Sequence, residues 1–233
     1  MTVKEVVPIN SGKFKVIFEE NYSIPLYKTE IRRYNIEAGR ELEDSDMNEI
    51  RKTLISRIKN RILYLLEDSD KSIHTIKSKM RFAGYPDDIV DEVTELFTEY
   101  GYLDDKRYAR NYISSMSVYM KKSKKAIITG LYSKGISREI IDEVIEEYEF
   151  GDRELILDTL RKKGYTQESL AEIDFSVKKS LISMLLRRGF EYEEICSIFT
   201  GVFAAGGYFI LYLPTEAAER ATACLQPAVL RLG

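Results

Sequence analysis

Hydrophobic positions along this chain recur in three copies of one pattern, separated by about fifty residues. In each copy an apolar stripe with helical spacing ends at a glycine (Gly84, Gly135 or Gly189), and a bulky apolar residue follows before a second stripe begins. Counted from these glycines, five apolar positions match in all copies: Ile76/Ile127/Leu181, Met80/Leu131/Leu185, Tyr85/Ile136/Phe190, Val90/Ile141/Ile195 and Val93/Val144/Ile198. The pattern predicts a linear array of stacked helical repeats, an architecture that usually presents an extended surface to a partner.

The spacing inside each copy predicts three helices. In the first copy Ile50, Leu54, Ile58 and Ile62 fall on one face of a long helix over about residues 44–67. The first copy has two further predicted helices, one capped by Ser72 and ended by Gly84 and one that follows Pro86. In the second copy the predicted helices are residues 105–120, a segment ending at Gly135 and residues 137–149. In the third copy they are a helix from Asp152 that breaks at Gly164, a basic helix before Gly189 and residues 191–199.

The N-terminal residues follow a different pattern. Residues 13–18 and 22–27 alternate or cluster β-forming side chains, which predicts a β-hairpin with Pro25 in an edge strand. Because a lone hairpin is only marginally stable, we expect it to pack on a helix over residues 30–34. The alternative is a partly ordered arm.

The predicted fold is therefore mainly α, with three tandem three-helix repeats in an elongated array and a small N-terminal β-hairpin region. The expected segments are the hairpin region 1–45, repeats at 46–103, 104–150 and 151–200, and an atypical tail at 201–233. In this tail only four of thirty-three residues are charged and the repeat pattern fails. An edge strand with a short helix, a partner-binding segment and sequence unrelated to the repeat fold all stay open.

Charge is segregated within each repeat although the net charge is only −3. The second helix of each copy is basic and the third is acidic. The basic runs form a candidate binding surface for a filament or for nucleic acid: Lys77, Lys79, Arg81, Lys121, Lys122, Lys124, Lys125, Lys134, Lys178, Lys179, Arg187 and Arg188. The alternative is that these side chains neutralise the adjacent acidic helices. Aromatic residues near the runs (Phe82, Tyr119, Tyr132) could stack on bases, although tyrosines at helical spacing are more often in the core.

No catalytic or cofactor motif is evident in the sequence. It has no Gly-x-x-x-x-Gly-Lys-Ser/Thr phosphate loop, and its single histidine, His74, has no evident triad or metal-ligand companions. Cys196 and Cys224 lack ligand spacing. We therefore expect no enzyme activity, metal or cofactor. Because no signal-like or membrane-spanning run is visible, the expected location is cytoplasmic, without a membrane.

One motif resembles a known family. The segment Gly101-Tyr-Leu-Asp-Asp-Lys-Arg-Tyr-Ala109, followed by Arg110-Asn-Tyr-Ile113, resembles the signature of the RecX family of recombination regulators, whose three-repeat plan is also similar. In physical terms the motif is interpreted as a joint between repeats. Tyr102 and Leu103 are expected to lock the first repeat onto the second, Asp104 to cap the next helix, and Arg107 and Arg110 to reach the acidic third helix.

The resemblance implies a non-catalytic regulator that binds the RecA filament, in the setting of DNA repair, homologous recombination and the SOS response. It implies restraint of strand exchange, ATP hydrolysis and co-protease activity, and some members are said to bind single- or double-stranded DNA directly. Groove binding, end capping and triggered disassembly of the filament all stay open, and a monomer is the simplest expectation. The alternative function is a helix-turn-helix transcription regulator that reads a specific DNA sequence.

Overall fold

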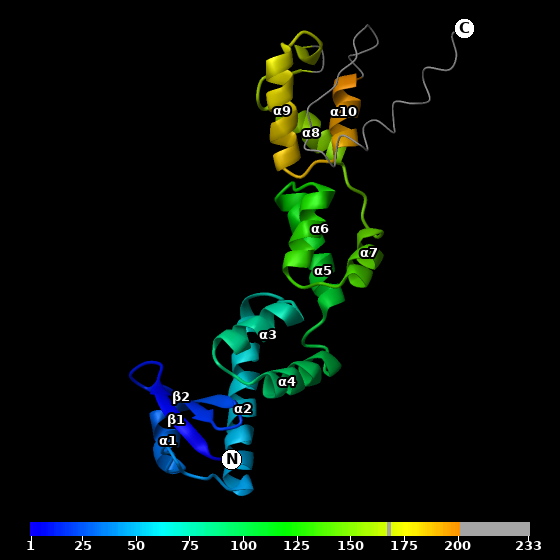
Figure 1. The fold of residues 1–233 in the computed structure, drawn as a ribbon. Helices are drawn as coiled ribbons and strands as arrows, with labels where there is room; N and C mark the ends of the chain where they lie inside the picture. Colours follow the sequence, from blue (N-terminus) through cyan, green and yellow to red (C-terminus); the bar gives the residue numbers. More distant parts are fainter. Residues whose placement is uncertain (167–168, 201–233) are drawn as a thin grey trace, which may run out of the picture.

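The computed structural model describes residues 1–166 and 169–200, which form an elongated array of helical units with a small sheet at one end (Figure 1). This arrangement confirms the predicted mainly α array with an N-terminal β region. The predicted tail 201–233, including Cys224, lies outside the described residues. None of the described helices combines the length and hydrophobicity that a membrane span requires.

The N-terminal sheet is antiparallel, with strand order β1-β2-β3. Its strands are β1 (Val3–Pro8), β2 (Lys13–Phe18) and β3 (Ser23–Tyr27). The predicted hairpin is β2–β3, in register at Val16 and Ile24, with Pro25 in edge strand β3. Strand β1 was not predicted, and it pairs with β2 through contacts such as Val6 with Val16. The sheet packs beside the short helix α1 (Lys28–Arg33), close to the helix expected at residues 30–34.

The first repeat contains α2 (Asp44–Asp68), α3 (Ile73–Phe82) and α4 (Asp87–Glu99). The predicted stripe of α2 is buried at Ile50, Leu54, Ile58 and Ile62. These side chains belong to one hydrophobic core with the inward side chains of the sheet, such as Phe18. The sheet and the first repeat therefore fold around a common core.

The second and third repeats each have a core of their own. The second contains α5 (Asp105–Ser114), a π-helical turn η1 (Ser115–Tyr119), α6 (Lys124–Ser133) and α7 (Arg138–Ile145). The third contains α8 (Asp152–Arg161), a short 3₁₀ turn η2 (Ser169–Ala171), α9 (Phe175–Arg187) and α10 (Tyr192–Thr200).

The three repeat glycines occupy equivalent local environments. Gly84, Gly135 and Gly189 have φ values of +88°, +73° and +85°, a left-handed conformation that favours glycine. After each glycine the amide of the bulky apolar residue donates to the carbonyl five residues back, as Ile136 does to Leu131 at 3.2 Å. This Schellman closure buries the apolar residue in the core of its repeat, which explains the glycine-apolar signature.

The second helices of the repeats are joined end to end. Ser72, the N-cap residue of α3, donates its hydroxyl to the carbonyl of Lys134 at the C-terminus of α6, at 2.7 Å. Ser123, the N-cap residue of α6, donates to the carbonyl of Gly189 just beyond α9, at 2.6 Å. Both hydroxyls are buried, and Figure 1 shows α9, α6 and α3 following one another along the array. Their dipoles therefore run head to tail across two joints.

A carboxylate completes each of these joints. Asp105, the first residue of α5, accepts a hydrogen bond from the amide of Ile73 at 2.9 Å, and Asp152, the first residue of α8, accepts from the amide of Lys124 at 3.2 Å. Each aspartate thus satisfies the first free amide of the preceding repeat's second helix. Burial is the main cause that raises the pKa of both carboxyls.

The N-terminal sheet makes the corresponding contact at the end of the array. The ammonium of Lys13 donates to the carbonyl of Ala83 at 2.8 Å. Ala83 directly precedes Gly84, as Lys134 precedes Gly135, so the acceptor lies at the same position of the repeat. The sheet therefore covers the helix end that a preceding repeat would otherwise cover.

Candidate binding groove

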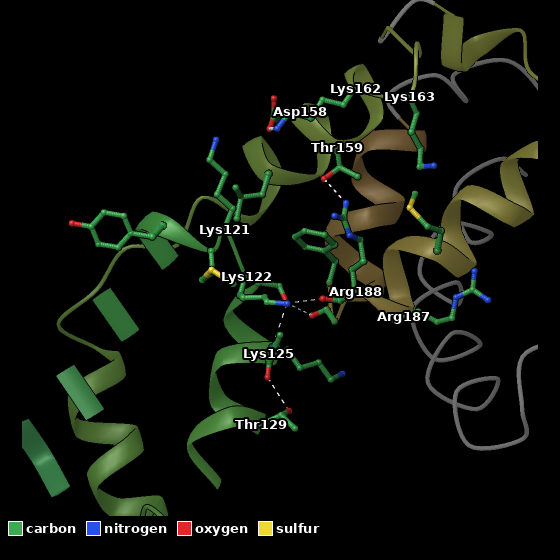
Figure 2. A pocket seen from close by; sticks show the side chains of 18 residues that line it. Lys121, Lys122, Lys125, Thr129, Asp158, Thr159, Lys162, Lys163, Arg187 and Arg188 are labelled. Carbon is green, nitrogen blue, oxygen red and sulfur yellow. Dashed lines mark hydrogen bonds and ion pairs between the residues drawn. The ribbon is translucent and has the colours of Figure 1, made fainter. Parts of the chain in front are cut away.

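A groove of about 1050 Å³ lies between the second and third repeats. Figure 2 shows the basic side chains that line it, which come from both repeats. We call it the basic groove and define it by its charged lining: Lys121, Lys122 and Lys125 from the second repeat, and Asp158, Lys162, Lys163, Arg187 and Arg188 from the third.

The wall from the second repeat is set by the end of the π-helical turn. The backbone of Lys121 has φ +46°, a left-handed conformation that is uncommon outside glycine. The amide of Lys122 donates to the carbonyl of Met116 at 3.0 Å, which closes the turn before Ser123 caps α6. The sharp turn brings both lysines to the rim, beside the joint between Ser123 and Gly189.

The wall from the third repeat comes from α8 and from the end of α9. Lys162 pairs with Asp158 at 2.7 Å on α8, and the guanidinium of Arg188 donates to the hydroxyl of Thr159 at 3.0 Å (Figure 2). Lys125 reaches from α6 to Glu191 at 3.2 Å. These contacts occupy three of the seven basic side chains that line the groove.

The other four basic side chains have no ion pair or side-chain hydrogen bond among the described residues. They are Lys121, Lys122, Lys163 and Arg187. All four residues are exposed, and Asp158 is the sole carboxylate that lines the groove within residues 1–166 and 169–200. The pKa of Asp158 is lowered, first by the hydrogen bond from Lys162 and further by the charges of Lys162, Lys121 and Arg161. The groove is thus a site of positive potential that favours an anionic ligand.

Comparison with known proteins shows to which family this chain belongs. A family model described as RecX, second three-helix domain, matches residues 104–145. Regulatory protein RecX of Clostridium acetobutylicum is 31% identical over 150 residues, which cover 63% of this chain and 69% of the relative. Regulatory protein RecX of Mycobacterium leprae is 30% identical over 122 residues, which cover 52% of this chain and 71% of the relative.

The chain belongs to the RecX family. Its relatives carry the name of regulatory proteins, and two crystal structures share the fold. One, of a regulatory protein RecX, has a TM-score of 0.53 and 17% identity, and covers 84% of this chain and 98% of that one. The other, of RecX from Lactobacillus salivarius, has a TM-score of 0.53 and 22% identity, and the match covers 65% of this chain and 97% of that one.

In this RecX-family chain the groove brings together five of the predicted basic residues. They are Lys121, Lys122, Lys125, Arg187 and Arg188. Lys162 and Lys163 are absent from the predicted surface, because that prediction considers only the second helix of each repeat and these residues follow the first helix of the third repeat. Their signal in the sequence was a basic run directly before Gly164, which ends α8 with φ +88°.

The other predicted basic residues lie elsewhere. In the first repeat Lys77 pairs with Asp91 at 2.8 Å and Arg81 with Asp87 at 2.7 Å, so the alternative of neutralising the acidic helix describes these two. The ammonium of Lys124 lies 5.6 Å from the ring centroid of Phe150. Three further residues lie outside the groove lining without an ion pair in the described part of the chain: Lys79, Lys134 and Lys179.

Lys178 is a correction to the predicted surface. The residue is only 6% exposed, and its ammonium lies 5.5 Å from the ring centroid of Phe199. It shares the buried face of α9 with Leu181, Ile182 and Leu185, at spacings of three, four and seven residues. Burial lowers its pKa. The prediction that Lys178 is part of an exposed basic surface was therefore wrong.

The aromatic residues near the basic runs are more exposed than expected. Tyr119 is 81% exposed, Phe82 96% and Tyr132 48%, so none of the three is a core residue. Tyr119 also lines the basic groove.

Two of the predicted contacts of the RecX motif are present, and both lie within the second repeat. Asp104 caps α5 by accepting from the amides of Lys106 and Arg107 at 2.9 Å, as predicted. Arg110 reaches Glu147, just beyond α7, at 2.7 Å. Arg107 was predicted wrongly: it donates to the carbonyls of Gly101 and Tyr102 at 3.0 Å and lies 3.6 Å from Asp70, because its position on α5 faces the first repeat.

The first residues of the motif belong to the first repeat. Leu103 is buried in the core of that repeat. Tyr102 is 53% exposed, with its ring centroid 5.5 Å from that of Phe97. Leu103 is thus held within the first repeat, and Tyr102 packs on Phe97 of the same repeat. The predicted lock of these two residues onto the second repeat stays a prediction.

The described residues offer little for metal or nucleophilic chemistry. No group of three histidine, cysteine or acidic side chains within them is placed to hold a metal ion. Burial is the main cause that raises the pKa of the Cys196 thiol, which disfavours the reactive thiolate. His74 packs against Gly135 at the joint between the first two repeats.

Proposed function

We propose that this RecX-family chain binds the RecA filament through the basic groove and inhibits RecA ATPase, strand exchange and co-protease activity without catalysing a reaction itself. The observation that carries the proposal is the convergence, at one joint of a linear array, of four cations from two repeats that have no ion pair within the described part of the chain. A linear array of repeats suits a filament as partner, because successive repeats can lie along the length of the filament. The chain acts as a monomer in the cytoplasm in this proposal.

The electrostatic contribution predicts a strong dependence on salt. Unpaired surface cations attract an anionic partner over about a Debye length, roughly 10 Å at moderate ionic strength. Complementary charges mainly raise the association rate, so higher salt is expected to slow binding more than it speeds dissociation. Family membership supports RecA as the regulated protein, and the groove supplies a contact surface for it.

The test is the ATPase activity of RecA on single-stranded DNA at increasing concentrations of the full chain. We expect inhibition that weakens as salt rises. Inhibition well below one chain per RecA protomer indicates action at filament ends, whereas inhibition near one per protomer indicates occupation along the filament. An ATPase rate unchanged by an excess of folded chain contradicts the proposal.

Direct binding of DNA is the second candidate function. The exposed ring of Tyr119 lies on the lining of the same cationic groove, and aromatic rings stack on unpaired bases. Titration of labelled DNA of random sequence, with and without RecA, separates the candidates. Binding that requires no RecA but depends on one specific sequence favours a transcription regulator instead.

A further inference from the structure

The basic groove is lined by apolar as well as cationic side chains, and we call its apolar lining the floor. Leu155, Ala126 and Met184 line the groove and are partly exposed, and Phe190 also lines it but is buried. Met120 adds an apolar side chain that is 57% exposed. These side chains come from both repeats, so the apolar floor spans the joint. A phosphate chain makes its contacts with cations and gains little from an apolar surface.

The dimensions of the groove suit side chains rather than a single ion. A volume of about 1050 Å³ is at the upper end of the range that holds small organic ligands, so it accommodates several residues of an extended or helical peptide. The four cations without a partner in the described part of the chain lie around the apolar floor, on both sides of the joint. A ligand that fills this site combines carboxylates with apolar side chains.

We propose that the basic groove binds an acidic segment of a partner protein, with apolar side chains of that segment on the floor formed by Met120, Leu155 and Met184. Its carboxylates pair with Lys121, Lys122, Lys163 and Arg187. The inference rests on the proposed function only for the identity of the partner, because peptide binding is measured without RecA.

Charge argues against the chain's own tail as the occupant. Residues 201–233 contain two glutamates and two arginines, so they offer no net negative charge to the groove. A partner segment rich in aspartate and glutamate gains from all four cations and needs no displacement of the pairs that Lys162 and Lys125 already make. Complementarity therefore favours a segment from another protein.

The experiment uses fluorescence anisotropy of short labelled synthetic peptides with the full chain. The first peptide carries aspartates and glutamates with interspersed leucine and phenylalanine. In the second each apolar residue is replaced by serine, and in the third each acid is replaced by its amide. Unlabelled single-stranded oligothymidylate serves as a competitor.

Two variants locate the site, and a third serves as the control. The cation variant carries Lys121→Gln, Lys122→Gln, Lys163→Gln and Arg187→Gln. The floor variant carries Met120→Gln and Met184→Gln. The control carries Lys4→Gln, Lys15→Gln, Lys28→Gln and Arg32→Gln, four exposed cations of the N-terminal region with the same change in charge. Circular dichroism and thermal melting establish that each variant is folded.

We expect the first peptide to bind, and its Kd to rise about tenfold or more in the cation variant, since each exposed ion pair contributes a modest amount. The floor variant is expected to bind the first peptide several-fold more weakly than the unmodified chain does, and the unmodified chain is expected to bind the serine peptide several-fold more weakly than the first peptide. The control variant is expected to bind the first peptide like the unmodified chain. Equal binding of the serine peptide, or a floor variant without effect, overturns the inference in favour of a general polyanion site. Absence of peptide binding also overturns it. If RecA ATPase is inhibited in that case, the proposed function stands while this inference fails.

Discussion

The hydroxyl of Ser72 donates a 2.7 Å hydrogen bond to the carbonyl of Lys134, 62 residues further along the chain. The same hydroxyl accepts from the amide of Thr75 as the cap of α3. One serine therefore begins a helix in the first repeat and satisfies the end of a helix in the second. Ser123 repeats both contacts one unit further on, and this second joint places the basic groove.

Removing either joint serine is expected to destabilise the array more than removing an ordinary cap. Ser72→Ala and Ser123→Ala each lose a cap and leave a carbonyl without its partner, so the free energy of unfolding is expected to fall by about 1–2 kcal/mol. Ser137→Ala is the matched control, because Ser137 caps α7 and its side chain makes no hydrogen bond to another repeat within residues 1–166 and 169–200, and about 0.5–1 kcal/mol is expected. Urea unfolding followed by circular dichroism measures the difference. Equal losses at all three positions contradict a role in the joints.

The repeat glycines are expected to differ in their tolerance of alanine. All three are left-handed, which costs a substituted residue roughly 1–2 kcal/mol. At Gly84 an added Cβ meets no atom within 4 Å, whereas at Gly135 it lies 2.3 Å from the Cβ of His74 across the first joint. Thermal melting is expected to rank Gly84→Ala as the mildest change, Gly189→Ala next and Gly135→Ala as the most severe. A Gly135→Ala variant as stable as Gly84→Ala contradicts the close packing of that joint.

Ionisation of Asp152 is expected to weaken the fold. Burial is the main cause that raises its pKa above the ordinary 3.8, with the charges of Glu194 and Glu191 in support, although Lys124 acts in the opposite direction. Since the folded state then binds the proton more tightly than the unfolded state, the stabilisation is complete below pH 3.8 and is lost as pH rises through the raised pKa. Asp152→Asn keeps an oxygen acceptor without this titration.

The measurement is urea unfolding of the unmodified chain and of Asp152→Asn over a series of pH values. The stability of the unmodified chain relative to the asparagine variant should fall as pH rises above 3.8 and then level off. A relative stability that rises over this window contradicts the assigned direction of the shift.

Glycine at position 121 is expected to preserve or increase stability while it removes a charge. Lys121 has a left-handed backbone, and glycine adopts that conformation without steric cost, so the gain is expected to lie between zero and about 1 kcal/mol. Lys122→Gly is the matched control, since Lys122 is not left-handed and loses roughly 0.5–1 kcal/mol on substitution. Melting temperatures compare the two variants. A Lys121→Gly variant less stable than Lys122→Gly contradicts the strain at this turn.

The repeats and their helix ends follow from the sequence because local rules determine them. A left-handed helix end requires glycine and the next residue closes the core, so Gly84, Gly135 and Gly189 mark equivalent positions through their residue type and spacing alone. The burial of Lys178 also had a local signal, because its spacing from Leu181 and Leu185 puts it on the apolar face of α9. Its position within a basic run outweighed that spacing in the sequence analysis.

The groove could not be predicted in the same way. It depends on contacts between residues far apart in the chain, such as Ser123 with Gly189, whose separation is 66 residues. The contribution of Lys162 and Lys163 depends on how α8 packs beside the end of α6, which no periodicity within one repeat encodes. Strand β1 was not predicted, because its lysine and glutamate interrupt the apolar alternation.

The most direct test of the central claim is co-sedimentation of the chain with RecA filaments on single-stranded DNA. The cation variant, a groove variant with Lys121, Lys122, Lys163 and Arg187 changed to Gln, is compared with the N-terminal control of equal charge. We predict that the control pellets with filaments like the unmodified chain, while the groove variant stays in the supernatant at matched concentration and unchanged melting temperature. A groove variant that pellets as well as the control contradicts the assignment of this groove to filament binding.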